Sequence, residues 1–199
     1  SDYDAHILSL RDSGKTAFEI YDDLTIKDIQ DAADQFRSLY EESDYLDGYV
    51  SLEINPKLAM NALASIKEGG RLFKKVNRPN VMIKVPSTPA GFPVIEELLA
   101  QGVCVNVTLI FSLEQYTKSA QAFLLGLRRF LKKGGDACTI RSVASVFVSR
   151  IDTAVDQKLE ENIAAVNDPG TKNKLTALKG NAAGANARVI FEKFQSIFK

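Results

Sequence analysis

The order of apolar and polar residues along the chain predicts helices and strands in regular alternation. Four runs have the bulky, β-branched character of buried parallel strands; they cover residues 49–54, 81–85, 103–110 and 140–147. Other segments repeat apolar residues at intervals of three and four, which is the spacing of a helix. These helices are expected over residues 25–42, 58–76, 94–100, 112–133, 150–166 and 172–198, and residues 1–13 also have helical spacing.

Local signals set the expected ends of several helices. Thr25, followed three residues later by an acidic residue, is the expected cap of the first long helix. Ser112 is the expected cap of the helix after the third strand, which ends in basic residues and glycines. Glycines predict an interruption near residues 69–70 and a break or close packing at Gly180 and Gly184.

Strands that alternate with helices through short loops predict an α/β protein with a parallel sheet. An open doubly wound sheet and a β/α barrel both have this pattern. A doubly wound nucleotide-binding protein usually carries a glycine-rich turn after an early strand, whereas the paired glycines here, residues 69–70 and 134–135, lie at helix ends. The pattern therefore favours a TIM-type (β/α)8 barrel, with residues 1–199 forming a single domain.

Composition and charge indicate which kinds of binding partner are not expected. The 25 basic residues balance the 25 acidic ones, so neither a nucleic-acid surface nor an anionic-membrane surface is expected. No secretory signal opens the chain and no apolar run approaches the length of a membrane span, so the expected location is a reducing cytoplasm. Cys104 and Cys138 lack metal-ligand spacing, and the one histidine, His6, has no acidic or cysteine cluster beside it. A metal site and serine–histidine chemistry are therefore not expected.

One charged residue interrupts the second apolar strand. Lys84 stands between Ile83 and Val85, and a lysine is almost never fully buried without a reason. Desolvation favours the neutral amine, which is a nucleophile. The alternative is a lysine near a strand end whose ammonium group reaches water.

The other strands carry polar residues on one face. Side chains two apart share a face of a strand, and both faces of a parallel sheet are normally apolar. The polar positions are Ser51 and Glu53 on the first strand, Lys84 on the second, Asn106 and Thr108 on the third, and Ser145 on the fourth. All lie toward the carboxyl ends of their strands, where β/α barrels build their active sites.

These residue types suit chemistry at a ketone. An amine such as that of Lys84 can attack a ketone to form a carbinolamine and then a Schiff base, which acts as an electron sink for carbon–carbon cleavage. Glu53 is the candidate base and Thr108 the hydroxyl that positions a water for proton transfer. The alternative for Glu53 is a structural ion pair with Lys84.

The remaining polar residues are candidates for substrate binding. Asn106 and Ser145 can hydrogen-bond substrate hydroxyls, and Arg150, just beyond the fourth strand, can pair with a phosphate. Alternatively, Asn106 and Thr108 satisfy backbone groups at a strand end, and Arg150 is a solvated residue of a first helical turn.

Together these residues resemble the transaldolase family over nearly the whole chain. The motifs that carry the resemblance are Val50-Ser51-Leu52-Glu53, Ile83-Lys84-Val85-Pro86-Ser87-Thr88, Asn106-Val107-Thr108-Leu109-Ile110-Phe111-Ser112 and Ser145-Val146-Phe147-Val148-Ser149-Arg150. Transaldolases are eight-stranded β/α barrels that need no cofactor. They move a dihydroxyacetone unit from a ketose phosphate to an aldose phosphate in the pentose phosphate pathway.

The resemblance implies a role for each candidate residue. Lys84 is the implied Schiff-base lysine, and Glu53 and Thr108 hold the catalytic water. Asn106 and Ser145 contact the sugar donor, and Arg150 binds its phosphate. Residues 179–187 are similar to a helical stretch in a transaldolase subgroup that includes forms fused to an isomerase.

The chain also departs from the family pattern. The family's first strand carries an acid–base aspartate and its second an Asn-Pro motif, and neither is found before Ser1. The chain therefore corresponds to strands three to six, an incomplete barrel expected to have little activity and to self-associate. The alternatives are a fructose-6-phosphate-type class I aldolase, which releases its triose, and a non-catalytic fragment that binds sugar phosphates.

Overall fold

A four-stranded parallel sheet organises the computed structural model, which describes residues 2–199. The strands are β1 (Val50–Glu53), β2 (Val81–Pro86), β3 (Val105–Ile110) and β4 (Ser142–Val146). They lie side by side in chain order, and all three pairings are parallel. This confirms the predicted α/β fold, and the sheet is consistent with four neighbouring strands of an incomplete TIM-type barrel.

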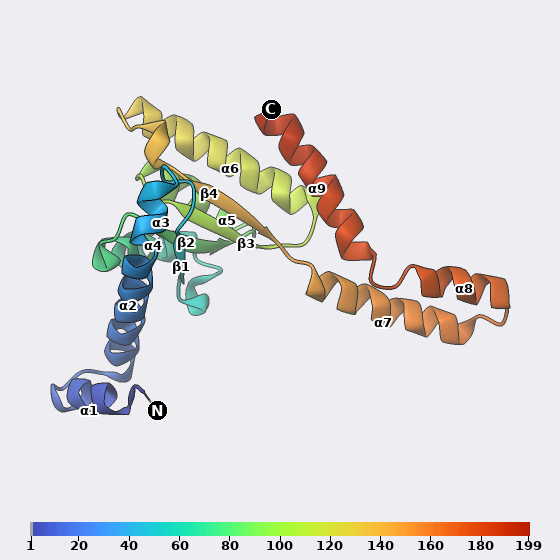
Figure 1. Cartoon of the computed structure of the whole chain (residues 1–199), viewed down its shortest axis with the longest axis horizontal. Coiled ribbons are helices and arrows are strands. Elements are labelled where there is room, and N and C mark those ends of the chain that lie inside the picture. The colour runs from blue at the N-terminus through green and yellow to red at the C-terminus, as the bar shows by residue number, and fades with distance from the viewer. Residues whose placement is uncertain (1) are drawn as a thin grey trace.

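Helices between the strands cover one face of the sheet (Figure 1). They are α4 (Ala62–Val76), α5 (Gly91–Ala100) and α6 (Leu113–Lys132), with the short turns η1 (Pro56–Leu58) before α4 and η2 (Ala137–Thr139) before β4. The side chains of Ile83, Val85 and Val105 on this face are at most 1% exposed. The opposite face carries the polar positions, so the buried core and the polar residues occupy different sides of the same strands.

Three helices precede the first strand: α1 (Asp4–Asp12), α2 (Ala17–Gln35) and α3 (Arg37–Glu42). The predicted cap at Thr25 is wrong, because Thr25 lies inside α2. Thr16 caps this helix instead: its hydroxyl accepts the Glu19 N–H, and the Glu19 carboxylate accepts the Thr16 N–H. This capping box satisfies two backbone donors at once, so it sets the start of the helix.

The predicted interruption of α4 at Gly69 is also wrong, because the helix runs through it. An added Cβ at Gly69 would lie 2.9 Å from a methyl group of Leu98 on α5. The glycine therefore allows α4 and α5 to pack closely. Asn61 caps α4 by accepting the Ala64 N–H at 3.0 Å, so the helix begins later than residue 58.

The last part of the chain contains α7 (Ser149–Ala165), α8 (Pro169–Ala177) and α9 (Ala182–Phe198). In Figure 1, α7 and α8 extend away from the sheet and α9 turns back toward α6. The predicted break occurs at Gly180, which has a φ of +69°, whereas Gly184 lies inside α9. Among residues 2–199, no helix is long and apolar enough to cross a membrane.

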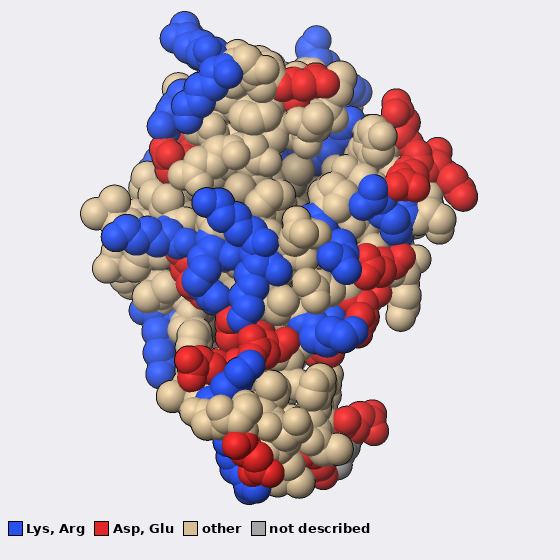
Figure 2. All heavy atoms as spheres, turned by 90° about the vertical axis from the view of Figure 1, so that its left-hand side faces the viewer, with Lys and Arg blue, Asp and Glu red and all other residues tan. Residues whose placement is uncertain are grey.

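A network of charged side chains attaches α2 to α4. Arg71 donates two hydrogen bonds to the Asp22 carboxylate, at 2.6 and 2.9 Å, and Lys75 donates a third at 2.5 Å. Figure 2 shows acidic and basic side chains interleaved over this side of the molecule. Asp22 is 7% exposed, and these bonds, chiefly those from Arg71, lower its pKa from 3.8 to about 2. The carboxylate is thus held in its charged form by the fold.

We expect Asp22→Asn to lower the free energy of unfolding at pH 7 by about 1–2 kcal/mol, less than the full pKa shift implies because Arg71 and Lys75 are partly exposed. The folded-state pKa lies below the unfolded one, so this stabilisation is present above about pH 4 and disappears as the pH falls toward 2. Urea unfolding at several pH values measures the difference. Asp34→Asn is the matched control, because Asp34 is on the same helix but pairs with Arg78 at the surface. Equal losses in both variants would contradict a special role for Asp22.

Candidate active site

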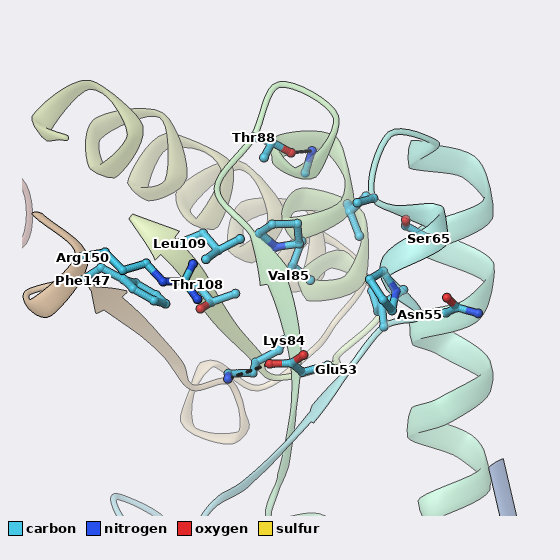
Figure 3. Close-up of a pocket in the computed structure, with 16 residues that line it drawn as sticks. Glu53, Asn55, Ser65, Lys84, Val85, Thr88, Thr108, Leu109, Phe147 and Arg150 are labelled. Atoms are coloured by element: carbon cyan, nitrogen blue, oxygen red, sulfur yellow. Dashed lines mark hydrogen bonds and ion pairs between the residues drawn. The ribbon is translucent and has the colours of Figure 1, made fainter. Parts of the chain in front are cut away.

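A cavity of about 420 Å³ opens at the carboxyl ends of β1, β2 and β3 (Figure 3). Four of the six residues predicted for the site line it: Glu53, Lys84, Thr108 and Arg150. Each comes from a different element. The parallel arrangement of the strands brings these residues, which are far apart in the sequence, to the same end of the sheet. This is the end of the strands at which β/α barrels place catalytic groups.

Lys84 and Glu53 are direct cross-strand neighbours in the β1–β2 register. The Lys84 Nζ donates to the Glu53 Oε1 at 2.9 Å, as the dashed line in Figure 3 shows. The side chains are 30% and 68% exposed, which is less burial than the apolar strand around Lys84 suggests. The ion pair that sequence reasoning left open is therefore formed, and it is accessible to solvent.

Asn106 and Ser145 are brought together, but outside the cavity lining. The Ser145 hydroxyl donates to the Asn106 Oδ1 at 2.8 Å, and the Asn106 Nδ2 donates to the Ser51 hydroxyl at 3.0 Å. This chain of hydrogen bonds spans β1, β3 and β4 on the polar face. Ser51 was not predicted as a site residue, although its position two residues before Glu53 placed it on the same face.

Thr108 lies at an irregularity in β3. The pairing of β3 with β4 shifts between Val107 and Ile110, and Leu109 has a φ of +59°. A positive φ is costly for a leucine and marks local strain. The Thr108 carbonyl accepts the Ser87 N–H at 2.8 Å, so Thr108 remains attached to the chain that leaves β2.

Arg150 lies in the first turn of α7 and extends toward Thr108 in Figure 3. Its guanidinium carbon lies 5.1 Å from the centre of the Phe147 ring, which is a cation–π contact. Among residues 2–199, no acidic side chain forms a salt bridge with Arg150. Its planar donors are therefore available to a bound anion. Phe147 was not singled out from the sequence, where an aromatic residue after a strand is more often part of the core.

Thr88 and Gly91 hold the loop that follows the lysine strand. The Thr88 hydroxyl accepts the Gly91 N–H at 3.1 Å. A Cβ added to Gly91 would lie 1.9 Å from the carbonyl oxygen of Pro86, the last residue of β2. Only glycine permits this approach of α5 to the end of β2.

The side chains around the cavity supply an amine, a carboxylate, a hydroxyl and a guanidinium. This set can attack a carbonyl, transfer a proton and hold an anion. Among residues 2–199, no three His, Cys, Asp or Glu side chains are grouped closely enough to hold a metal ion.

Comparison with known proteins assigns the chain to a family. The sequence profile of the family described as "Transaldolase/Fructose-6-phosphate aldolase" matches residues 1–199. This chain is a member of that family. The match confirms the resemblance carried by the four strand motifs.

Curated relatives named as transaldolases align with almost all of the chain. A "Transaldolase" of Trichodesmium erythraeum is 42% identical over 197 residues, covering 99% of this chain and 52% of the relative. A "Transaldolase 2" of a Nostoc species is 41% identical over 198 residues, with 99% and 52% covered. A "Transaldolase" of Thermobifida fusca is 43% identical over 196 residues, with 98% and 51% covered. The chain thus spans about half the length of the curated relatives it matches.

Proposed function

We propose that this chain carries the Schiff-base site of a transaldolase, which transfers a dihydroxyacetone unit between sugar phosphates in the pentose phosphate pathway. The observation that carries the proposal is the contact of Lys84 with Glu53 at a cavity that Thr108 and Arg150 also line. Family membership supports it. Both cysteines, Cys104 and Cys138, are free thiols, which agrees with a proposed location in the reducing cytoplasm.

The first step we propose is proton transfer within the ion pair. Glu53 takes a proton from the Lys84 ammonium, along the 2.9 Å hydrogen bond, and leaves a neutral amine. The amine nitrogen then forms a bond to the ketone carbon of the donor, and the ketone oxygen takes a proton to give a carbinolamine. Loss of that oxygen as water, with Glu53 and Thr108 directing the proton, yields the Schiff base.

Substrate binding is assigned to the remaining candidates. Arg150 pairs with the donor phosphate through its unpaired guanidinium edge. Asn106 and Ser145 contact donor hydroxyls, which requires that the substrate replace the hydrogen bond that now joins them. The resemblance assigns acid–base work in carbon–carbon cleavage to an aspartate without a match in residues 1–199, and we assign that step to none of the residues described here.

A second candidate function is cleavage without transfer. The matching family description names fructose-6-phosphate aldolase beside transaldolase, and the same lysine chemistry serves both reactions. In the aldolase the triose leaves instead of joining an acceptor aldose. Binding of sugar phosphates without turnover is the remaining alternative.

If Lys84 forms the intermediate, borohydride reduction with fructose 6-phosphate should add mass to the peptide containing Lys84. Lys84→Arg should abolish this trapping, because a guanidinium is effectively never deprotonated in proteins. Peptide mass spectrometry after reduction locates the modified lysine. Trapping on Lys74 or Lys75 instead would contradict the assignment of Lys84 as the lysine that forms the Schiff base.

Product analysis with and without an acceptor aldose then separates the two reactions. Product that appears only with the acceptor indicates a transaldolase, whereas triose released without one indicates an aldolase. An ordered protein with no turnover in either assay would favour sugar-phosphate binding alone.

Glu53→Gln should slow Schiff-base formation and leave the melting temperature nearly unchanged. Glutamine keeps the size of glutamate but cannot accept the lysine proton, and an exposed ion pair contributes little to stability. Trapping kinetics and thermal unfolding measure the two effects on one preparation. Unfolding of the variant would instead favour the structural ion pair.

We also propose that the 199-residue chain self-associates. β1 and β4 are the edge strands, and neither has an outer partner among residues 2–199. Unpaired strand edges invite pairing with another chain, and Val143 on β4 is 45% exposed. Sedimentation should therefore show dimers or larger species whose proportion rises with concentration. A stable monomer at high concentration would contradict this expectation.

A further inference from the structure

Gln115, in the first turn of α6, makes three hydrogen bonds to main-chain groups of two other segments. Its Nε2 donates to the Ser87 carbonyl at 2.8 Å and to the Leu109 carbonyl at 3.2 Å. Its Oε1 accepts the Phe111 N–H at 3.0 Å. A single side chain thus connects the chain leaving β2 with the chain leaving β3.

Both segments lie directly beyond residues of the candidate site. Ser87 follows Lys84 by three residues, and Leu109 follows Thr108 by one. The β2–β3 pairing reaches this point, where the Ser87 N–H donates to the Thr108 carbonyl, but the β3–β4 pairing shifts and Leu109 has a positive φ, so β4 does not pair regularly with this backbone. The Gln115 amide provides hydrogen-bond partners where the sheet does not.

The side chain of Gln115 does not act as an ordinary helix cap. In a capping box, the residue three positions after the cap reaches back to the backbone N–H of the cap. Here Ser112 caps α6 by accepting the Gln115 N–H at 3.2 Å. The Gln115 amide instead bonds to Phe111, one residue earlier, and crosses to β2. The sequence pattern Ser-x-x-Gln predicts a cap, but the structure shows a connection between two strands.

Two buried hydroxyls reinforce the same contact. Ser87 is fully buried and Ser119 is 3% exposed, and their oxygens lie 2.9 Å apart. Both also lie within hydrogen-bond distance of the Gln115 main-chain carbonyl, at 3.2 and 2.9 Å. The end of β2 is therefore attached to this turn of α6 by both the side chain and the main chain of Gln115.

We propose that Gln115 is a positioning residue, whose amide holds the ends of β2 and β3 in the arrangement that places Lys84 and Thr108 at one cavity. This inference rests on the proposed Schiff-base chemistry. Gln115 does not line the cavity, so it acts through the backbone rather than on the substrate. Its loss should affect the rate of reaction at Lys84 more than the binding of sugar phosphate.

Two variants separate the functions of the amide. Gln115→Glu keeps an acceptor for the Phe111 N–H but loses both donors, and Gln115→Met loses all three hydrogen bonds. At saturating fructose 6-phosphate, both should slow borohydride trapping at Lys84 by roughly ten- to a hundredfold. The half-saturating concentration should change by less than about threefold, because Arg150 is untouched.

Hydrogen exchange at the Phe111 amide gives a readout that does not depend on catalysis. Exchange measured by NMR should accelerate in Gln115→Met and remain slow in Gln115→Glu. Gln101→Met is the matched control, because Gln101 is exposed and its side-chain amide donates to Glu97 in the last turn of α5. It should leave trapping and the Phe111 exchange rate unchanged.

A stability control distinguishes loss of strand-end positioning from a general loss of stability. Ala122→Gly lowers the stability of the same helix at a buried position two turns beyond Gln115. The proposal is overturned if this variant, at an equal loss of melting temperature, slows trapping as much as Gln115→Glu. It is also overturned if both Gln115 variants trap at the wild-type rate, or if neither folds at low temperature. A wild-type chain that does not trap at Lys84 would instead reject the proposed function on which this role rests.

Discussion

The alternation of side chains along β2 is the constraint on which the rest of the structure depends. Ile83 and Val85 point into the core beneath the helices, where they are at most 1% exposed. Lys84, between them, must then point to the opposite face. A shift of one residue would place the charge in the core and two apolar side chains in water. Burial of the core therefore also determines which face of the sheet carries the polar site.

Much of the fold could be predicted because short stretches of sequence indicate where strands and helices begin and end. The four strands were located to within about two residues at each end, since β-branched runs between turns have few other interpretations. The start of α2 was missed although Thr16 and Glu19 form a readable capping box. The continuity of α4 through Gly69 could not be read locally, because it depends on the neighbouring Leu98 side chain.

The sequence predicted which residues share the polar face of the sheet better than it predicted their contacts with one another. Periodicity places Glu53 and Lys84 on one face, but only the hydrogen-bonded register makes them neighbours. Asn106 and Ser145 are joined across a strand pair whose register shifts, and no local signal reports that shift. The role inferred for Gln115 depends on three backbone groups from two segments, so it becomes visible only when the strands are assembled.

The close approach at Gly91 has a consequence for anion recognition at the cavity. The start of a helix usually offers free N–H groups to a phosphate. In α5 the first two, those of Gly91 and Phe92, already donate to the Thr88 carbonyl, at 2.8 and 3.0 Å. The third helical residue is Pro93, which has no N–H. The first three residues of the helix that follows the lysine strand thus offer the cavity no unpaired N–H group, so under the proposed function a side chain would bind the phosphate on this side. Under the proposed function that side chain is Arg150, whose guanidinium lies against the Phe147 ring and forms no salt bridge among residues 2–199.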